Sequence, residues 1–300
     1  MSKKLLLGII IILLITNIAT LLFWSKNKRE ETTIEENDVT ISSTDPVATI
    51  DKDTITYDEW MDDLRNNYGK QQLKSMIDHH IVNKLAAEKN IIIDDKVLDR
   101  EVAHLTTMAG IMTKEEAARR EKEWREAVEY RYQLEMLLTD GEKVPEADIR
   151  EFYDNYHKQY DFEASIQLSH IVLPNMETAE KVKRELDSGA SFGLLAQEYS
   201  VDEETKDDGG YLGFFVHTSQ FIPDGYVEKV SEMKEHSYSK PFETDDGVAI
   251  IYLHRKLPTI TFTYEEIKPY IKNELALERT DQSLTADPLW NKFDIDWIYE

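Results

Sequence analysis

The first apolar run of the chain constrains it most, because this run has the length and composition of a membrane-spanning helix. Leu5 to Trp24 carries no charged residue and consists largely of leucine and isoleucine. As a helix, these twenty residues measure about 30 Å, which is the thickness of the hydrocarbon core of a bilayer. Trp24 and the basic residues that flank the run suit the membrane interface. We therefore expect a transmembrane anchor in residues 1–25.

A cleaved signal peptide is the alternative for this segment. The apolar run is longer than an ordinary signal-peptide core, and no small-x-small cleavage motif follows it. A lipid-anchored precursor would need a cysteine, which the sequence lacks. Basic residues flank both ends and orient the helix weakly, but a long acidic domain translocates largely regardless of charge. The expected location is the cell membrane, with an uncleaved single-pass signal-anchor and the bulk of the chain outside the cytoplasm.

Charge and composition exclude several classes of protein. Lys and Arg number 35 against 59 Asp and Glu, which gives a formal net charge of −24, and cysteine is absent. The chain therefore has no thiol nucleophile, disulfide or cysteine-based metal site. Nucleic acid is not an expected partner, because affinity for it comes largely from cations that neutralise phosphates. At 41% hydrophobic residues the chain can still bury real cores.

Residues 26–45 and 46–160 differ in pattern. The first stretch is rich in Glu, Thr and Ser without a helical apolar stripe, which predicts a solvated polar tether. The second begins with two short strands around a turn at Asp51–Asp53, followed by a helix for which Thr56 and Glu59 form a capping box. Apolar residues at helical spacing then predict long amphipathic helices. These helices are expected over 73–85, from Asp94 to Met108, over 114–138 and from Pro145 onward.

From Gln167 the pattern changes to that of a small α/β module. Its expected elements are a strand over 167–173, two helices broken at Gly189, a glycine-bearing loop over 206–215, a short helical stretch over 225–233 and a strand over 247–253. Residues 264–280 return to a helical pattern. The alternating apolar residues of 285–300 predict a strand that packs back onto the helical domain, with an exposed partner-binding tail as the alternative.

Four sequence blocks in this module carry a resemblance to a known family. They are SHIVL at 169–173, LDSGASFGLLAQEYS at 186–200, GGYLGFF at 209–215 and KPFETDDGVAIIYL at 240–253. In this order and spacing the module resembles the parvulin-type peptidyl-prolyl isomerases. Its flanks, with their VATIDKDTITYDEW start and amphipathic helices, resemble the PrsA/SurA-type extracytoplasmic foldases. The resemblance implies an α+β chain with an N-terminal transmembrane helix, a mainly helical chaperone-like domain at 46–160 and 258–300, and an inserted small α/β parvulin domain at 161–257.

The chemistry of such an isomerase needs few special groups. Rotation about a peptide bond faces a barrier of about 18–20 kcal/mol, and X–Pro isomerisation is slow enough to limit folding. The enzyme has to grip the proline ring and bind the twisted amide better than the planar one, with polar groups near the carbonyl. No nucleophile, metal or cofactor is required. His79 and His80 are adjacent, which is not the four-residue spacing of a two-histidine metal site on a helix.

The resemblance implies roles for six residues. The catalytic positions correspond to His170, Asp202 and Thr244, and the substrate-binding positions to Leu212, Phe221 and Tyr226. From residue type alone, His170 would be a buried strand histidine and Asp202 a loop or capping carboxylate. The three substrate-binding residues would then simply belong to the core.

One position departs from the family pattern. The second histidine of the family corresponds to Ala249. His254 lies five residues further on with the opposite strand parity, at about 16 Å, so it cannot replace that histidine. His217 follows the glycine-bearing loop, and its distance from the site stays open. The missing histidine would have been a hydrogen-bonding partner of His170, so weakened or lost catalysis is an alternative.

The expected function is that of a membrane-anchored foldase, which catalyses cis/trans isomerisation of X–Pro bonds in exported unfolded proteins and acts as a chaperone. The alternative is a non-catalytic chaperone or peptide-binding protein with a degenerate parvulin domain. Residues 161–257 contain 9 basic and 19 acidic residues, a net charge of −10, which argues against phosphorylated substrates. The expected partners are unfolded or newly exported polypeptides and the cytoplasmic membrane through residues 5–24, without nucleic acid. A homodimer stays an open alternative.

Overall fold

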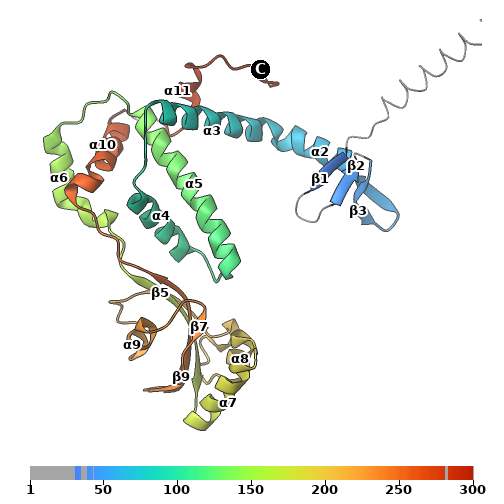
Figure 1. Ribbon diagram of the computed structural model, residues 1–300, viewed down its shortest axis with the longest axis vertical. Helices are drawn as coiled ribbons and strands as arrows, with labels where there is room; N and C mark the ends of the chain where they lie inside the picture. Colours follow the sequence, from blue (N-terminus) through green and yellow to red (C-terminus); the bar gives the residue numbers. More distant parts are fainter. Residues whose placement is uncertain (1–30, 35–38, 43, 281–282, 300) are drawn as a thin grey trace, which may run out of the picture. The chain divides into compact units, whose positions relative to one another are not determined.

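The computed structural model describes residues 31–34, 39–42, 44–280 and 283–299. The chain divides into two compact units, Met1–Ile77 with Asp296–Glu300 and Asp78–Ile295 (Figure 1). The predicted anchor at 5–24 lies outside the described residues. Among the residues that are described, no helix is both long enough and apolar enough to cross a membrane.

Two β-hairpins open the first unit. β1 (Glu31–Ile34) pairs with β2 (Val39–Ser42), and β3 (Pro46–Ile50) pairs with β4 (Asp53–Thr56), both antiparallel. The second hairpin confirms the predicted strand–turn–strand, and its turn residue Asp51 has a φ of 53°. The first hairpin lies within the stretch predicted as a tether, where threonine, valine and isoleucine favour extended backbone.

The helix α2 (Tyr57–Leu64) follows directly and begins with the predicted capping box. The Thr56 hydroxyl accepts a hydrogen bond from the Glu59 backbone N–H at 3.3 Å, and the Glu59 carboxylate accepts one from the Thr56 N–H at 2.8 Å. Both bonds satisfy N–H groups that have no partner inside the helix. A π-helical segment (Arg65–Gly69) then leads into α3 (Lys70–Glu88).

The second unit has a helical part and a sheet part. Besides residues of α3, the elements of the helical part are α4 (Asp95–Met108), α5 (Lys114–Leu138), α6 (Glu146–Tyr156), a 3-10 turn (His157–Tyr160), α10 (Tyr264–Thr280) and α11 (Asp287–Trp290). The side chains of Asp94 and Thr113 cap α4 and α5, so these helices begin where the sequence predicts. Helices α4, α5, α6 and α10 share one core, which includes Val97, Val128 and Ile267.

The strand predicted for 285–300 is wrong, because the described residues of this segment contain the short helix α11 and no strand. Pro288 lies in the first turn of α11, where its missing N–H is not needed, and the same feature prevents it from donating in a strand ladder. Leu289 is buried, and the Trp290 indole N–H donates to the Asp78 carboxylate of α3 at 2.6 Å. Residues 287–290 thus pack onto the helical part as a short helix.

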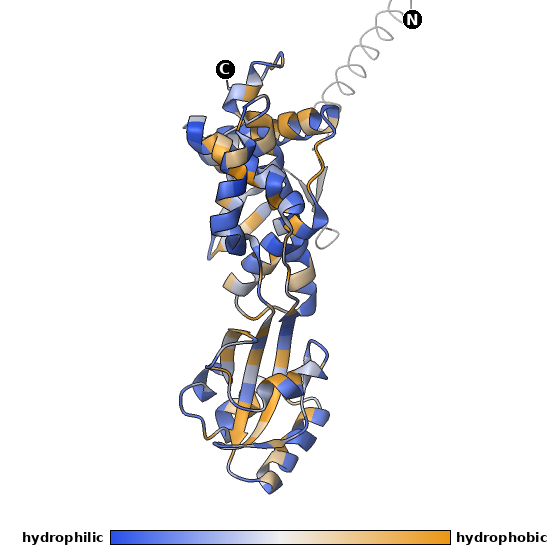
Figure 2. Cartoon of the chain, turned by 90° about the vertical axis from the view of Figure 1, so that its left-hand side faces the viewer, coloured by the Kyte–Doolittle hydropathy of each residue, from blue (hydrophilic) through white to orange (hydrophobic). Residues whose placement is uncertain are grey.

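The sheet part is built around one antiparallel sheet. Its elements are β5 (Ser165–Leu173), α7 (Met176–Asp187), α8 (Phe192–Tyr199), a 3-10 turn (Lys206–Asp208), β6 (Tyr211–Val216), α9 (Tyr226–Ser231), β7 (Ser237–Tyr238), β8 (Phe242–Thr244) and β9 (Gly247–Leu257). The strand order is β6-β5-β9-β7, and β8 also pairs with β9. β5 is buried along its whole length, and Figure 2 shows hydrophobic stretches along the strands, interrupted by hydrophilic residues. β6 corrects the predicted loop, because Gly213 with its φ of 94° obscures the strand pattern.

The two faces of this sheet carry different helices (Figure 1). On one face α7 and α8 cover a core that includes Ile171 and Ile250. On the other face α9 covers a core that includes Leu168 and Ile251. The helix α6 precedes the sheet part in the chain and α10 follows it, and these two helices share the core of the helical part. The sheet part is therefore an insertion in the helical part.

Candidate active site

His170 lies in the second half of β5, and its backbone is tightly fixed. Its N–H donates to the Gly210 carbonyl at 2.8 Å, next to a register irregularity between Leu168 and Ser169. A Cβ on Gly210 would lie 1.9 Å from the His170 carbonyl oxygen, so only glycine allows this approach. His170 itself is 6% exposed. The strand and the loop before β6 together hold this residue in place.

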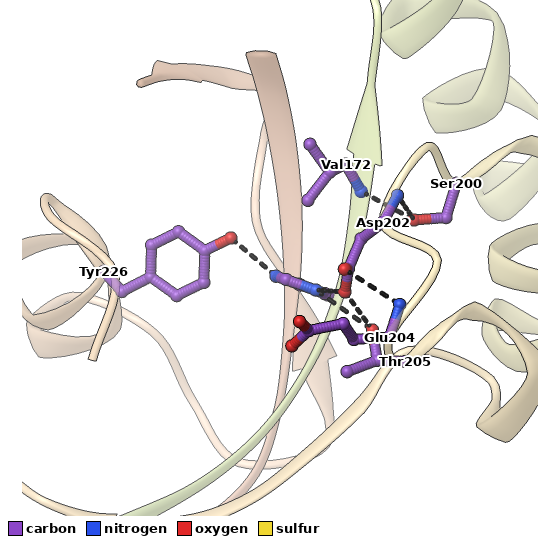
Figure 3. A network of polar contacts seen from close by, with 7 residues as sticks. Val172, Ser200, Asp202, Glu204, Thr205 and Tyr226 are labelled. Carbon is purple, nitrogen blue, oxygen red and sulfur yellow. Dashed lines mark hydrogen bonds and ion pairs between the residues drawn. The ribbon is translucent and has the colours of Figure 1, made fainter. Parts of the chain in front are cut away.

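The imidazole of His170 is held from both sides, by Tyr226 on one side and by Asp202 and Thr205 on the other (Figure 3). Its Nδ1 lies 2.8 Å from the Tyr226 hydroxyl, and its Nε2 lies 2.7 Å from Asp202 Oδ2 and 3.2 Å from Thr205 Oγ1. An ionised carboxylate only accepts hydrogen bonds, so Nε2 carries a proton and its N–H donates a hydrogen bond to Asp202. In the neutral ring, Nδ1 then accepts a hydrogen bond from the Tyr226 hydroxyl. The two contacts select one tautomer of His170.

Asp202 follows α8 in a turn that its own side chain stabilises. Its Oδ1 accepts a hydrogen bond from the Glu204 N–H at 3.2 Å, and its Oδ2 accepts one from the Thr205 hydroxyl. Burial raises the pKa of Asp202, but the hydrogen bonds from Thr205 and His170 outweigh this effect and hold the pKa below its ordinary value. Asp202 is therefore an anion at neutral pH, placed directly behind the imidazole.

The other predicted site residues are placed by different elements. Thr244 lies on β8, and its hydroxyl donates within the hairpin to the Gly247 carbonyl at 3.0 Å. Leu212 packs, half-buried, against the core under α9, whereas Phe221 before α9 is 78% exposed. Tyr226, the first residue of α9, is 1% exposed, so its ring is buried and its hydroxyl faces the imidazole. Of the six predicted residues, the hydrogen bonds join the histidine, the aspartate and the tyrosine.

Known proteins with similar sequences decide the family. The Rotamase family, described as the PPIC-type PPIASE domain, matches residues 175–255. YacD of Bacillus subtilis (strain 168), a protein assigned to the peptidyl-prolyl cis-trans isomerases, is 33% identical over 259 residues, which cover 86% of this chain and 87% of that protein. The foldase protein PrsA of Geobacillus kaustophilus (strain HTA426) is 30% identical over 244 residues, which cover 80% of this chain and 79% of that protein. The chain belongs to the PrsA-like parvulins.

The family predicted from the four sequence blocks is therefore confirmed, and this PrsA-like parvulin is a peptidyl-prolyl cis-trans isomerase. The crystal structure of PrsA from Bacillus subtilis aligns with 86% of this chain and 96% of that chain, at 23% identity and a TM-score of 0.33. A TM-score this low adds nothing to the family assignment.

In this PrsA-like parvulin a buried alanine occupies the position of the second histidine. Ala249 is fully buried in the core under α9. His254 lies on the opposite face of β9, where its Nε2 is 2.8 Å from the Ser169 hydroxyl. The prediction that His254 cannot take the place of the missing histidine beside His170 is therefore confirmed.

His217, which the sequence leaves open as a neighbour of the site, lies at the far end of the strand pair. The pairing of β5 with β6 brings Val216 opposite Ser165, and the His217 N–H donates to the Ala164 carbonyl at 3.0 Å. His170 lies five residues along β5 from Ser165, which is about 16 Å at the rise of a strand. His217 therefore provides no partner for His170.

Three residues that build the site are not among the predicted ones. The Ser200 hydroxyl accepts hydrogen bonds from the backbone N–H groups of Val172 and Asp202, at 3.2 and 3.3 Å, and so ties the turn after α8 to β5. The other two are Thr205 and Gly210. A hydroxyl three residues after an aspartate is typical of a turn closed by side chains, and a double glycine indicates a close backbone approach. Both signals are present in the sequence and could have identified these residues.

His254 makes the stability of this PrsA-like parvulin depend on pH. Burial lowers the pKa of His254 from 6.5 to about 4, with the charge of His236 as a smaller cause. Below pH 6.5 the unfolded chain binds a proton that the folded chain excludes. The stability that His254 contributes is therefore fully present above pH 6.5 and falls by up to about 3 kcal/mol towards pH 4.

The variant His254→Gln separates this effect from other titrations. Glutamine keeps a hydrogen-bonding group for Ser169 but does not titrate. Chemical denaturation of both proteins between pH 7 and about 4 should give a free energy of unfolding that falls more steeply for the wild type. Parallel curves for the two proteins would show that His254 does not cause the dependence.

Proposed function

We propose that this PrsA-like parvulin is a membrane-anchored foldase, which isomerises X–Pro bonds in newly exported, unfolded polypeptides outside the cytoplasm. The observation that carries the catalytic part is the His170 ring held between the Asp202 carboxylate and the Tyr226 hydroxyl. The imidazole is therefore a polar group in a fixed orientation, hydrogen-bonded to the Asp202 carboxylate. The charge-free run Leu5–Trp24 supports the anchoring part of the proposal.

Catalysis in this proposal comes from binding the twisted amide better than the planar one. When the amide twists, its resonance is lost and charge moves between the carbonyl oxygen and the nitrogen. His170 with Asp202, together with Thr244, forms the polar surface that favours the new charge distribution. Leu212 and the exposed ring of Phe221 provide apolar surface for the proline ring. No covalent bond forms between enzyme and substrate.

The helical part is proposed to hold the unfolded client. A cavity of about 630 Å³ lies between α3 and α5. Its lining includes His79, Ala86, Ile91, Glu123, Glu126 and Tyr130. This mixture of apolar and acidic groups is complementary to unfolded segments that carry apolar and basic side chains.

Protease accessibility tests the proposed location of the full-length chain. Protease added to intact cells should degrade the chain beyond the anchor, because that part would lie outside the membrane. A variant that lacks residues 5–24 is the matched control, and it should stay in the cytoplasm and resist the protease. Full protection of the wild-type chain, in cells whose exported marker protein is degraded, would rule out the extracytoplasmic location.

Ala249 favours a second candidate, in which the sheet part chiefly binds unfolded chains and isomerises them slowly. Two measurements on the full-length protein separate the candidates: relaxation of a cis X–Pro peptide and aggregation of an unfolded client. Accelerated relaxation supports the foldase proposal. Suppressed aggregation with only slightly accelerated relaxation supports the second candidate, and the absence of both effects would rule out both.

A further inference from the structure

We propose that Tyr226 is a positioning residue, whose hydroxyl fixes the ring orientation and the tautomer of His170. This inference rests on the proposed catalytic role of His170. Tyr226 acts through His170 and not on the substrate, because it is only 1% exposed. A residue that only lined an apolar proline pocket would need its ring and no hydroxyl. In this proposal the Tyr226 hydroxyl orients His170.

Packing fixes the direction of the Tyr226 ring. The helix α9 begins at Tyr226, directly after Gly225, whose φ of 81° turns the chain into the helix. The ring meets the Phe242 ring edge-on at 5.5 Å between centroids, and it meets the His170 ring edge-on at 6.0 Å. Edge-on contacts between aromatic rings are directional. The hydroxyl is therefore held against Nδ1 of His170 by the core and not by the hydrogen bond alone.

Ala249 leaves room for this arrangement. The pairing of β5 with β9 places Ile251 opposite His170, and Ala249 lies two residues along on the same face of β9. Ala249 and Tyr226 belong to the same core, and Ala249 has no exposed surface. A larger side chain at 249 would compete with the Tyr226 ring for volume, because buried cores are close-packed. β9 thus carries a small residue at the position that the resemblance assigns to a histidine, and His170 receives its hydrogen-bonding partner from α9.

The Tyr226 hydroxyl acts as the donor in this contact. Burial raises the pKa of Tyr226, and the negative charges of Asp246 and Asp202 raise it further. Tyr226 therefore keeps its proton, and its O–H donates a hydrogen bond to Nδ1 of His170, while Nε2–H of His170 donates a hydrogen bond to Asp202. One nitrogen of the ring accepts and the other donates, and this difference selects a single tautomer.

The variant Tyr226→Phe tests the proposal, because phenylalanine keeps the ring packing and removes only the hydroxyl. Nδ1 of His170 then stays buried without its donor, and we expect kcat for a cis X–Pro peptide to fall about tenfold. KM should change less than about twofold, because the hydroxyl does not touch the substrate. In nitrogen NMR spectra of the full-length chain, labelled at histidine, His170 should change from one tautomer to a mixture.

The variant Tyr238→Phe is the matched control. It removes a tyrosine hydroxyl that donates to Asp187 at 3.0 Å, away from His170, and should change neither kcat nor the His170 spectrum. If Tyr226→Phe lowers only the melting temperature, with the kcat and the His170 tautomer of the wild type, the proposal is overturned. A wild-type chain without isomerase activity would count against the proposed function alone. In that case the nitrogen NMR spectrum of His170 in Tyr226→Phe tests the positioning role alone: a mixture of tautomers supports it, and a single tautomer overturns it.

Discussion

Replacement of Asp202 by alanine is expected to lower kcat/KM for an X–Pro peptide by about ten- to a hundredfold. Asp202 is the anion behind His170, and a hydrogen bond to a charged group contributes about 1.5–3 kcal/mol. If this contact is stronger with the twisted amide bound, its loss raises the barrier by about that amount. Asp202→Asn keeps the shape and removes the charge, so its rate should lie between those of wild type and alanine. The measurement is the cis-to-trans relaxation of a short X–Pro peptide with the full-length protein.

The variant Asp207→Ala is the control for this experiment. Asp207 is an exposed carboxylate in the same loop, so its removal changes the net charge equally without touching His170. Its rate should equal that of the wild type. Melting curves of all variants distinguish loss of catalysis from loss of the fold. A wild-type rate in Asp202→Ala would contradict a catalytic role for Asp202.

The variant Gly210→Ala should lower the free energy of unfolding of the sheet part by about 4 kcal/mol. Its Cβ would lie 1.9 Å from the His170 carbonyl oxygen and 3.0 Å from the carbonyl carbon, and these are backbone atoms that cannot rotate away. The loop would have to move and lose the 2.8 Å hydrogen bond from the His170 N–H. A buried donor without a partner costs about 1–3 kcal/mol, and a left-handed backbone costs alanine about 1–2 kcal/mol more.

The variant Gly213→Ala separates these two contributions. Gly213 also has a positive φ, of 94°, but a Cβ there would meet no atom within 4 Å. Only the backbone cost of about 1–2 kcal/mol should remain. Chemical denaturation of both variants gives the comparison. Equal losses of stability would show that the approach of Gly210 to His170 is not what makes glycine necessary there.

The sequence predicted those structural elements that depend only on residues close to one another in the chain. The capping box of Thr56 and Glu59 and the starts of α4 and α5 are local, so they could be found without the fold. β6 was missed because a glycine interrupts its pattern, and its identity as a strand depends on pairing with β5. The prediction of a C-terminal strand was wrong, because Pro288 has no N–H for a strand ladder and suits the first turn of a helix, although the apolar residues around it alternate.

The site itself could be predicted only through the resemblance. Asp202 and Tyr226 lie 32 and 56 positions from His170 in the sequence, and no periodicity relates residues so far apart. The family pattern nevertheless named all three, because it reflects a fold that brings them together. The resemblance matched Tyr226 to an aromatic position of the family, so it predicted a role for the ring and none for the hydroxyl. The contact of its hydroxyl with Nδ1 depends on three-dimensional packing that the pattern does not contain.

The insertion of the sheet part determines the order in which the chain can fold. Its residues are contiguous, and Ser165 pairs with Leu257, so this part closes on itself as soon as β9 has been made. The core of the helical part, by contrast, needs α10 from beyond the insertion. Domains generally fold as units during synthesis from the N-terminus. The sheet part, with the candidate active site, can therefore fold first during synthesis. The helical part, which is proposed to hold the client, is completed afterwards.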